Sequence, residues 1–239
     1  FEQNNTTKSY ILNIKNYELF NKGKITSGQG IIYFVQDKTT GKRYAAKSNK
    51  HETDPNQNKR ILREINILIK VQHPTIVHFE GFSFTNIDDE NRITLFTDFI
   101  ETGTLADLLK KEKQGLLPDD FNNTKRQIIL TGIARGMMIL HKNNVINRDL
   151  KPENILINDK YQPLITDFGL SKIVNTENSQ TQSTSVVGTY AYIAPEVIES
   201  GYFGKKADVY SFGILMYEVV TGNRAMQNIT KNKEFNDMK

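Results

Sequence analysis

The chain has 239 residues, of which 38% are hydrophobic, and its 31 basic and 27 acidic residues give a net charge of +4. This length suffices for one large domain or two lobes. No apolar run approaches the ~20 residues of a membrane-spanning helix, and the mild, interspersed charge forms no basic stripe for nucleic acid. The absence of cysteine excludes disulfides and thiolate metal sites and suits a reducing compartment, so we expect a cytoplasmic location.

The N-terminal part of the chain is predicted to be β-structure. Residues 1–16 are polar with one weak apolar segment, and we read them as an N-terminal extension or a strand. An apolar strand core over 31–35 is followed by a turn and by a return strand over 43–47. Before them lie Gly28 and Gly30, and glycine lets backbone N–H groups approach phosphates closely. Taken by itself, this loop is better read as an ordinary β-turn.

A helix follows, and it carries one acid at an unusual position. Asp54-Pro55 is a cap residue followed by proline, which predicts the helix start, and His73-Pro74 predicts its end. Apolar residues recur between them at helical spacing, and Glu64 lies beside that stripe. An acid next to an apolar face requires a cation, and Lys47 at the end of the return strand supplies one. The sequence therefore predicts a Lys47–Glu64 ion pair.

Two further strands are predicted over 75–84 and 93–99, around a polar loop. Thr104 and Asp107 then form a capping-box pattern that opens a helix. A longer helix is predicted over 124–143, because its apolar residues share one face.

The next stretch, from Val145 to Ile157, places a charged turn between two apolar runs. Such a strand–loop–strand corner holds polar groups rigidly beside a core. The turn contains Asp149 and Asn154, and Asp167 follows behind a second apolar pair. Two carboxylates and an amide from neighbouring corners offer the oxygen ligands that Mg²⁺ prefers.

The remaining chain combines a polar loop with an apolar helix. Residues 171–186 are rich in Ser, Thr, Gln and Asn, and a long polar loop beside such a corner is typical of a conformational switch. The loop leads into Ala194-Pro195-Glu196. The run over 208–218 is apolar nearly all round, which predicts a central, buried helix.

In this order the motifs resemble those of eukaryotic-type protein kinases. Asn147-Arg148-Asp149-Leu150-Lys151-Pro152-Glu153-Asn154 is similar to the catalytic loop H-R-D-L-K-P-x-N, and it is followed by D-F-G at 167–169 and by A-P-E at 194–196. The D-V-Y-S-F-G sequence at 208–213 resembles the tyrosine-kinase-like group of Ser/Thr kinases. The resemblance covers about residues 17–222.

The resemblance implies an α+β, bilobal protein-kinase-like fold. Its N-lobe is small and β-rich with one main helix, and its C-lobe is larger and mostly helical. Within a single domain over 1–239, we place the N-lobe at about 17–97, the hinge at about 98–103 and the C-lobe at about 104–239. The family's C-lobe usually continues with several more helices beyond residue 222, so we expect a C-terminally truncated lobe here.

The resemblance also implies the catalytic roles. Asp149 would orient the acceptor hydroxyl and accept its proton, and Lys151 would neutralise charge on the transferring phosphate. Asn154 and Asp167 would ligate Mg²⁺. Lys47, held by Glu64, would grip the α- and β-phosphates of ATP.

The implied nucleotide site includes a departure from the family pattern. Of the glycine loop G-x-G-x-x-G, only Gly30 matches, or also Gly28 if one residue is deleted. Thr97 would be the gatekeeper, and Asp98 and Ile100 would offer backbone groups to adenine. The full set implied to bind the nucleotide is Ile25, Gly28, Gly30, Ile32, Ala45, Lys47, Thr97, Asp98, Ile100, Leu156 and Asp167.

Three further residues of the catalytic region carry expectations. Asn147 stands where the family has His; Asn can donate one hydrogen bond but packs less surface, so we expect a modest loss of rigidity. The Thr189 hydroxyl would brace Asp149 and Lys151. Glu153 is a single acid that would favour basic substrates.

The resemblance finally implies a partner and a function. Arg148 corresponds to the family's receiver of an activation-loop phosphate, which an upstream kinase would place on Thr181, Ser183, Thr184 or Ser185. We expect ATP-dependent, Mg²⁺-assisted phosphoryl transfer to Ser/Thr hydroxyls of protein substrates in signalling, with no nucleic-acid partner. The alternative is a pseudokinase or scaffold binding module with weakened ATP use, based on the degenerate glycine loop, Asn147 and the missing C-terminal helices.

Overall fold

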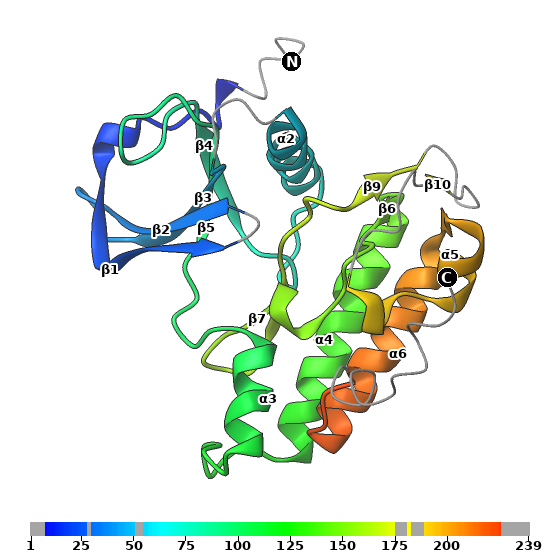
Figure 1. Ribbon diagram of the computed structural model, residues 1–239. Coiled ribbons are helices and arrows are strands. Elements are labelled where there is room, and N and C mark those ends of the chain that lie inside the picture. Colours follow the sequence, from blue (N-terminus) through cyan, green and yellow to red (C-terminus); the bar gives the residue numbers. More distant parts are fainter. Residues whose placement is uncertain (1–7, 28–29, 51–54, 175–180, 183–188, 226–239) are drawn as a thin grey trace. The chain divides into compact units, whose positions relative to one another are not determined.

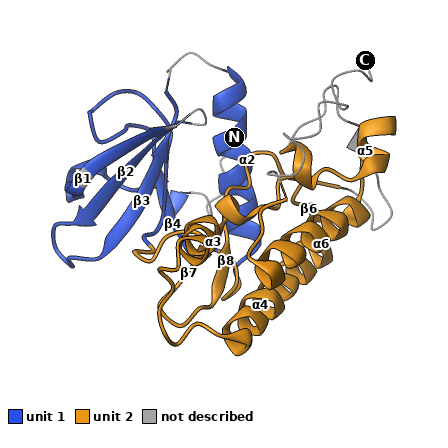
Figure 2. Ribbon diagram, turned by 60° about the horizontal axis from the view of Figure 1, so that its bottom comes forward, with its two compact units in different colours: residues 1–72, 77–99 blue, residues 73–76, 100–239 orange. Residues whose placement is uncertain are grey.

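The computed structural model describes residues 8–27, 30–50, 55–174, 181–182 and 189–225. The chain divides into two compact units, one formed by residues 1–72 and 77–99 and the other by residues 73–76 and 100–239 (Figure 2). The predicted α+β fold is confirmed: the first unit holds a β-sheet and one long helix, and the second is mostly helical (Figure 1). Among the described residues, no helix is both long and apolar enough to cross a membrane.

The first unit is built on a five-stranded antiparallel sheet with the order β1-β2-β3-β5-β4. A short 3₁₀ helix, η1 (Ile14–Asn16), precedes the strands, which are β1 (Tyr17–Ser27), β2 (Gly30–Asp37), β3 (Arg43–Ser48), β4 (Phe79–Ser83) and β5 (Thr94–Asp98). Alternate residues point to one face, so Tyr33, Val35, Tyr44 and Ala46 join Tyr17 and Phe96 in a buried core. The division of this region into an extension over 1–16 and a lobe over 17–97 remains a prediction.

Strand β4 is shorter than predicted. The sequence pattern suggests a strand over 75–84, but β4 begins at Phe79. The Ile76 N–H donates to the His73 carbonyl at 2.9 Å, so the chain turns there before the strand starts. The preceding Pro74 has no N–H to contribute to a strand ladder.

Helix α2 (Pro55–Lys70) contacts β4 and β5. It begins and ends close to the predicted positions. Its buried residues recur at helical spacing, and Glu64 is buried among them: Ile61, Glu64, Ile65, Ile67 and Leu68.

The second unit contains four α-helices among the described residues, namely α3 (Leu105–Lys113), α4 (Asn123–Lys142), α5 (Pro195–Ser200) and α6 (Lys205–Thr221), and the 3₁₀ helices η2 (Pro152–Asn154) and η3 (Tyr190–Tyr192). The predicted capping box is present, because the Thr104 side chain accepts from the Asp107 N–H while the Asp107 side chain accepts from the Thr104 N–H. Helix α4 packs against α6, and the two run side by side in Figures 1 and 2.

Within its described residues, this unit also contains three short antiparallel strand pairs. They are β6 (Val145–Ile146) with β9 (Lys172–Ile173), β7 (Ile155–Ile157) with β8 (Pro163–Ile165), and β10 (Thr181–Gln182) with β11 (Tyr202–Phe203). Strand β8 lies close against α4. A Cβ placed on Gly132 of α4 would be only 2.5 Å from the ring of Pro163 in β8. Glycine at this position therefore sets how closely the helix approaches the strand.

The predicted burial of α6 is only half right. Its inward face buries Asp208, Leu215 and Glu218, but its other face exposes large apolar side chains, including Val209 and Val220. In the described part of the chain, neighbouring elements therefore cover one side of this helix. Residues 226–239 lie outside the described residues.

Candidate active site

The predicted charged turn folds as a compact cluster around Asp149 in the second unit. Strand β6 leads into it and η2 leads out into β7, so both ends are anchored in short strand pairs. The Asp149 side chain is almost fully buried, and its carboxylate is held by cationic and amide donors. Lys151 Nζ lies 2.8 Å from Asp149 Oδ2, and Asn154 Nδ2 donates to the same oxygen at 2.9 Å.

The Thr189 hydroxyl joins this cluster as predicted. Lys151 Nζ donates to Thr189 Oγ1 at 3.0 Å, and Thr189 Oγ1 donates to Asp149 Oδ1 at 3.4 Å. Thr189 is brought here from a segment 40 residues away along the chain. One carboxylate, one ammonium and one hydroxyl therefore share a single hydrogen-bonded group.

Burial raises the pKa of the Asp149 carboxyl above its ordinary value. The ammonium of Lys151 and the amide of Asn154 act in the opposite direction by stabilising the carboxylate, whereas the negative charge of Asp167 raises the pKa further. Such an environment makes Asp149 a better proton acceptor than an exposed aspartate.

Asp208 on α6 fixes the backbone of the turn. Its carboxylate oxygens accept the N–H groups of Asn147 at 2.8 Å and of Arg148 at 2.9 Å. His141 Nε2 lies 2.8 Å from Asp208 Oδ2. Arg148 has φ of 69°, a left-handed conformation that side-chain-bearing residues rarely adopt, and its guanidinium lies over the Phe203 ring at 4.4 Å. The turn is therefore held in a strained shape by a buried carboxylate.

The Asn147 side chain contacts this turn through its oxygen and not through its nitrogen. Asn can donate a hydrogen bond, but Nδ2 has no hydrogen-bond partner among the described residues. Its oxygen makes the contact instead, because Oδ1 accepts the Asp149 N–H at 3.1 Å.

A backbone hydrogen bond joins the second corner to the first. Thr166 N–H donates to the Asn154 carbonyl at 3.0 Å, which brings the turn around Asp149 next to Asp167-Phe168-Gly169. Asp167 has φ of 59°, and Phe168 is fully buried. Of the two residues that the sequence names as metal ligands, Asn154 accepts this backbone hydrogen bond and Asp167 directly follows its donor.

The predicted ion pair forms in the first unit. Lys47 Nζ on β3 lies 2.9 Å from Glu64 Oε2 on α2, and Glu64 is 2% exposed. Its burial at the inward face of α2 follows from its place beside the apolar stripe. A buried ammonium–carboxylate pair holds the lysine side chain in one position.

The remaining residues of the predicted nucleotide set are divided between the units. Ile25, Gly30, Ile32, Ala45, Thr97 and Asp98 lie on β1, β2, β3 and β5 of the first unit, and Ile100, Leu156 and Asp167 belong to the second. Ala45 and Thr97 face each other across the β3–β5 pair. Gly28 lies outside the described residues.

Gly30 has a structural explanation of its own. Its φ is 146°, and a Cβ at this position would lie 2.4 Å from the Ser48 carbonyl oxygen. The glycine is therefore required by the close approach of β2 and β3, whether or not a phosphate binds near it.

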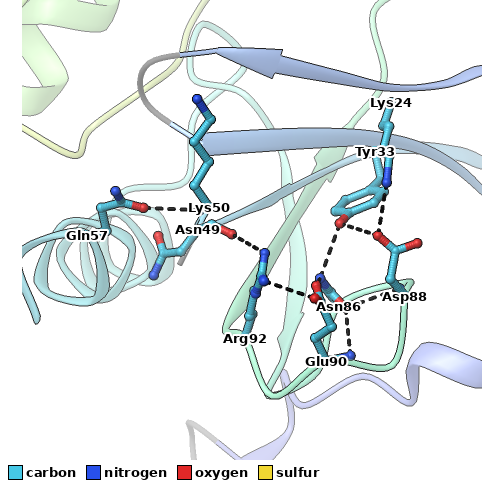
Figure 3. A network of polar contacts seen from close by, with 9 residues as sticks. All are labelled: Lys24, Tyr33, Asn49, Lys50, Gln57, Asn86, Asp88, Glu90 and Arg92. Carbon is cyan, nitrogen blue, oxygen red and sulfur yellow. Dashed lines mark hydrogen bonds and ion pairs between the residues drawn. The ribbon is translucent and has the colours of Figure 1, made fainter. Parts of the chain in front are cut away.

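A polar network spans the first unit from β1 and β2 to the start of α2 (Figure 3). Tyr33 Oη donates to Asp88 at 2.8 Å and accepts from the buried amide of Asn86 at 3.2 Å. Arg92 Nη1 donates to the Asn49 carbonyl at 3.3 Å.

The network continues from there into α2. The Lys50 N–H donates to Gln57 Oε1 at 3.1 Å, and Asn49 Nδ2 donates to Asn58 Oδ1 at 2.5 Å. Asn49 and Lys50, which follow β3, thus connect the loop between β4 and β5 to the first turn of the helix that carries Glu64. No pattern in the sequence pointed to these contacts.

Another group that sequence reasoning missed centres on Glu218 of α6. Tyr192 Oη lies 2.9 Å from Glu218 Oε2, and the Ala225 N–H donates to Glu218 Oε1 at 2.6 Å. Arg224 Nε lies 3.5 Å from Glu218, while Arg224 Nη2 lies 2.5 Å from Glu153. Glu153, expected to favour basic substrates, is therefore paired with an arginine of the same chain.

One further cluster in the first unit offers metal-ligand atoms. The ligand atoms of His78, Glu80 and Asp98 lie within 4.8 Å of one another. Lys42 Nζ already lies 3.0 Å from Asp98 and 3.4 Å from Glu80, and Asp98 raises the pKa of this lysine to about 12 against the opposing effect of burial. Because an ammonium neutralises these carboxylates at neutral pH, we do not assign a metal here.

Comparison with known proteins agrees with this geometry. A family model described as a protein kinase domain matches residues 21–239. The chain is 34% identical to "Cysteine-rich receptor-like protein kinase 44" of Arabidopsis thaliana over 85% of this chain and 49% of that protein. It is 36% identical to "Serine/threonine-protein kinase PBL27" of the same plant over 87% of this chain and 40% of the relative.

A third relative comes from rice. "Receptor-like cytoplasmic kinase 176" of Oryza sativa subsp. japonica is 36% identical over 73% of this chain and 43% of the relative. The chain thus spans about half or less of the length of these curated relatives. Since the family match extends over both units, the chain belongs to the eukaryotic-type protein kinase family.

Proposed function

We propose that the chain is the catalytic domain of a serine/threonine protein kinase that transfers the γ-phosphoryl group of ATP to a hydroxyl of a protein substrate. The observation that carries this proposal is the group formed by Asp149, Lys151, Asn154 and Thr189, in which a buried carboxylate is oriented by three donors. The "serine/threonine-protein kinase" name of one relative supports the acceptor class.

In the proposed reaction, the acceptor oxygen forms a bond to the γ-phosphorus while the bond to the bridging β,γ-oxygen breaks. The products are a phosphorylated hydroxyl and ADP, and the hydroxyl proton passes to Asp149. Lys151 neutralises charge on the transferring group. Lys47, kept in place by Glu64, binds the α- and β-phosphates. Positioning and electrostatic stabilisation account for most of the catalysis in such a reaction.

Two residues fit the ligand preferences of Mg²⁺. Asn154 donates its side-chain N–H groups to Asp149, so its remaining amide oxygen is the atom suited to a cation. Asp167 adds a carboxylate from the adjoining corner, and both are hard oxygen ligands. When bound, Mg²⁺ would neutralise phosphate charge. We therefore assign Asn154 and Asp167 as its ligands.

The nucleotide-binding role of the wider set rests on the same family pattern. We assign contacts with ATP to Ile25, Gly28, Gly30, Ile32, Ala45, Lys47, Thr97, Asp98, Ile100, Leu156 and Asp167. The single-domain division with a hinge over about 98–103 and a C-lobe from about 104 belongs to this proposal. So does membership of the tyrosine-kinase-like group.

Regulation and location are proposed on similar grounds. Phosphorylation by an upstream kinase would fall on Thr181, which lies in β10, or on Ser183, Thr184 or Ser185, which lie outside the described residues. We propose a cytoplasmic, signalling role, supported by the name of the rice relative.

A scaffold without catalysis is the second candidate. The packing of Gly30 against Ser48 supports it, because that glycine has a structural reason independent of phosphate binding. Asn147 in the catalytic loop supports it as well. A scaffold would keep the fold without phosphoryl transfer.

A phosphoryl-transfer assay separates the two. The chain is incubated with Mg·ATP and myelin basic protein, and Asp149→Asn is the matched control. We expect transfer by the unaltered chain well above the control. If the unaltered chain transfers no more phosphate than a folded Asp149→Asn variant, the proposed kinase activity is wrong.

Nucleotide binding is measured in parallel by thermal unfolding. A nucleotide present at 100 times its Kd adds about 2.7 kcal/mol to the free energy of unfolding. We expect such a shift with Mg·ATP and a smaller one in Lys47→Met. The scaffold is supported if the chain neither transfers phosphate nor shows this shift.

A further inference from the structure

Three consecutive backbone N–H groups at the catalytic turn are each accepted by a side chain. Those of Asn147 and Arg148 are accepted by the Asp208 carboxylate, at 2.8 and 2.9 Å. The third, of Asp149, is accepted by Asn147 Oδ1 at 3.1 Å. A buried N–H without an acceptor is unfavourable, so each of these contacts contributes to the shape of the turn.

While its oxygen makes this contact, the Asn147 side chain buries an unsatisfied hydrogen-bond donor. Its side chain is 1% exposed, and Nδ2 has no hydrogen-bond partner among the described residues. Leaving a buried donor unsatisfied destabilises a fold. An apolar residue would avoid that penalty but would leave the Asp149 N–H without its acceptor. The side-chain oxygen of Asn147, and not its nitrogen, therefore accounts for an amide side chain at this position.

We propose that Asn147 is a positioning residue that sets the backbone of Asp149 through its side-chain oxygen. The inference rests on the proposed function, because it assumes that Asp149 acts as the base. It concerns the conformation of the turn: Arg148, between the two residues, has φ of 69°, and such a conformation persists only when its surroundings hold it. Asp208 holds the turn on one side of Asp149 and Asn154 on the other, where Nδ2 donates to the Asp149 carbonyl at 2.8 Å. The Asn147 oxygen holds the N–H between them.

The proposal is tested with two substitutions at the same position. Asn147→Leu keeps a side chain of similar size but removes the oxygen that accepts the Asp149 N–H. Asn147→Ser removes Nδ2 but keeps an oxygen that can accept from the N–H two residues on. Ser171→Ala is the matched control, because Ser171 Oγ donates to the Asn147 carbonyl at 2.9 Å and does not contact the Asp149 N–H.

The first measurement is the initial rate of transfer to myelin basic protein. We expect Asn147→Leu to lower kcat by about tenfold to a hundredfold with the KM for ATP little changed, because a misplaced base affects the chemical step. Asn147→Ser and Ser171→Ala should stay within about threefold of the unaltered chain. The melting temperature of Asn147→Leu should change little, since the substitution removes one unsatisfied donor and creates another.

The second measurement is amide hydrogen exchange at Asp149, which does not depend on activity. We expect exchange about tenfold faster in Asn147→Leu, and close to that of the unaltered chain in Asn147→Ser. If Asn147→Leu does not fold, Asn147→Ala removes the same acceptor with less bulk.

Equal kcat and equal exchange in Asn147→Leu and the unaltered chain would overturn the proposal. So would a loss in Asn147→Ser as large as that in Asn147→Leu, because the oxygen would then not be the relevant atom. If the unaltered chain transfers no phosphate, the proposed function fails. Exchange at Asp149 then still decides whether the Asn147 oxygen sets this backbone.

Discussion

Asn154 donates its side-chain N–H groups to two atoms of Asp149, the backbone carbonyl at 2.8 Å and the carboxylate at 2.9 Å. A single amide therefore fixes both the backbone and the side chain of the same residue. Its side-chain oxygen takes part in neither of these two contacts. The orientation of Asp149, the proposed base, is therefore coupled to the position of Asn154, a proposed metal ligand. A substitution of either residue should change the position of the other.

The pH dependence of catalysis should report the buried state of Asp149. Burial raises the pKa of this carboxyl, so kcat should fall with decreasing pH at values above the ~3.9 of an ordinary aspartate. Lys151→Met removes the ammonium that lowers this pKa, and the acid limb should move to higher pH. Initial rates between pH 5 and 8, each normalised to its maximum, test this.

Two control variants accompany that measurement. Lys151→Arg keeps the positive charge, so its acid limb should stay close to that of the unaltered chain. Lys160→Met removes an exposed charge outside the cluster and should leave the profile unchanged. An acid limb that does not move in Lys151→Met would contradict the assignment of Asp149.

Arg224 should stabilise the fold mainly through its buried partner. Glu218 is fully buried, so Arg224→Gln leaves its carboxylate without the cation and should lower the free energy of unfolding by about 3 kcal/mol at pH 7.5. Glu153 is partly exposed, and Glu153→Gln should lower it by only about 0.5 kcal/mol. Urea denaturation measures both, and similar losses in the two variants would contradict this account.

The same pair predicts a dependence on pH. Burial raises the pKa of Glu218, while the Ala225 N–H and Arg224 lower it. Removing Arg224 therefore raises the pKa further, so the folded state retains a proton that the unfolded state has lost. Stability then falls as pH rises from the ordinary glutamate value of about 4.3 toward the folded pKa. The deficit of Arg224→Gln should consequently be smaller at pH 5 than at pH 7.5.

The network in Figure 3 should depend on the buried hydroxyl of Tyr33. Tyr33→Phe removes the donor to Asp88 and the acceptor for Asn86, and should lower the free energy of unfolding by about 1–2 kcal/mol. Lys24→Gln removes an exposed ion pair with Asp88 and should change it by less than about 0.5 kcal/mol. Thermal unfolding of both variants checks this, and equal effects would contradict it.

Glycine should be required on α4 but not on α6. Alanine normally stabilises a helix interior relative to glycine by about 1 kcal/mol. Gly132→Ala would place a Cβ 2.5 Å from the Pro163 ring, so we expect a loss of about 1–3 kcal/mol. Gly213→Ala meets no atom within 4 Å and should gain about 0.5–1 kcal/mol. A gain in both variants, measured by urea denaturation, would show that α4 can move away from β8.

The sequence by itself determined the features that depend on neighbours along the chain. Three features could be predicted because they follow from local geometry: the strand–turn–strand unit of β2 and β3, the capping box of Thr104 and Asp107, and the place of Glu64 beside an apolar stripe. The order of the motifs was likewise sufficient to identify the family.

Only the tertiary structure decided several other contacts between distant side chains. Glu153 pairs with Arg224, 71 residues away, and Tyr33 with Asp88, 55 residues away. The sequence does not show which acidic residue pairs with which partner, because the chain contains many acidic and basic residues. The packing of the folded chain determines which of them come into contact. The same holds for Asn147, whose residue type allowed both a donor and an acceptor. The turn around Asp149 uses the acceptor, because in its folded shape the Asn147 oxygen lies within hydrogen-bonding distance of a backbone N–H.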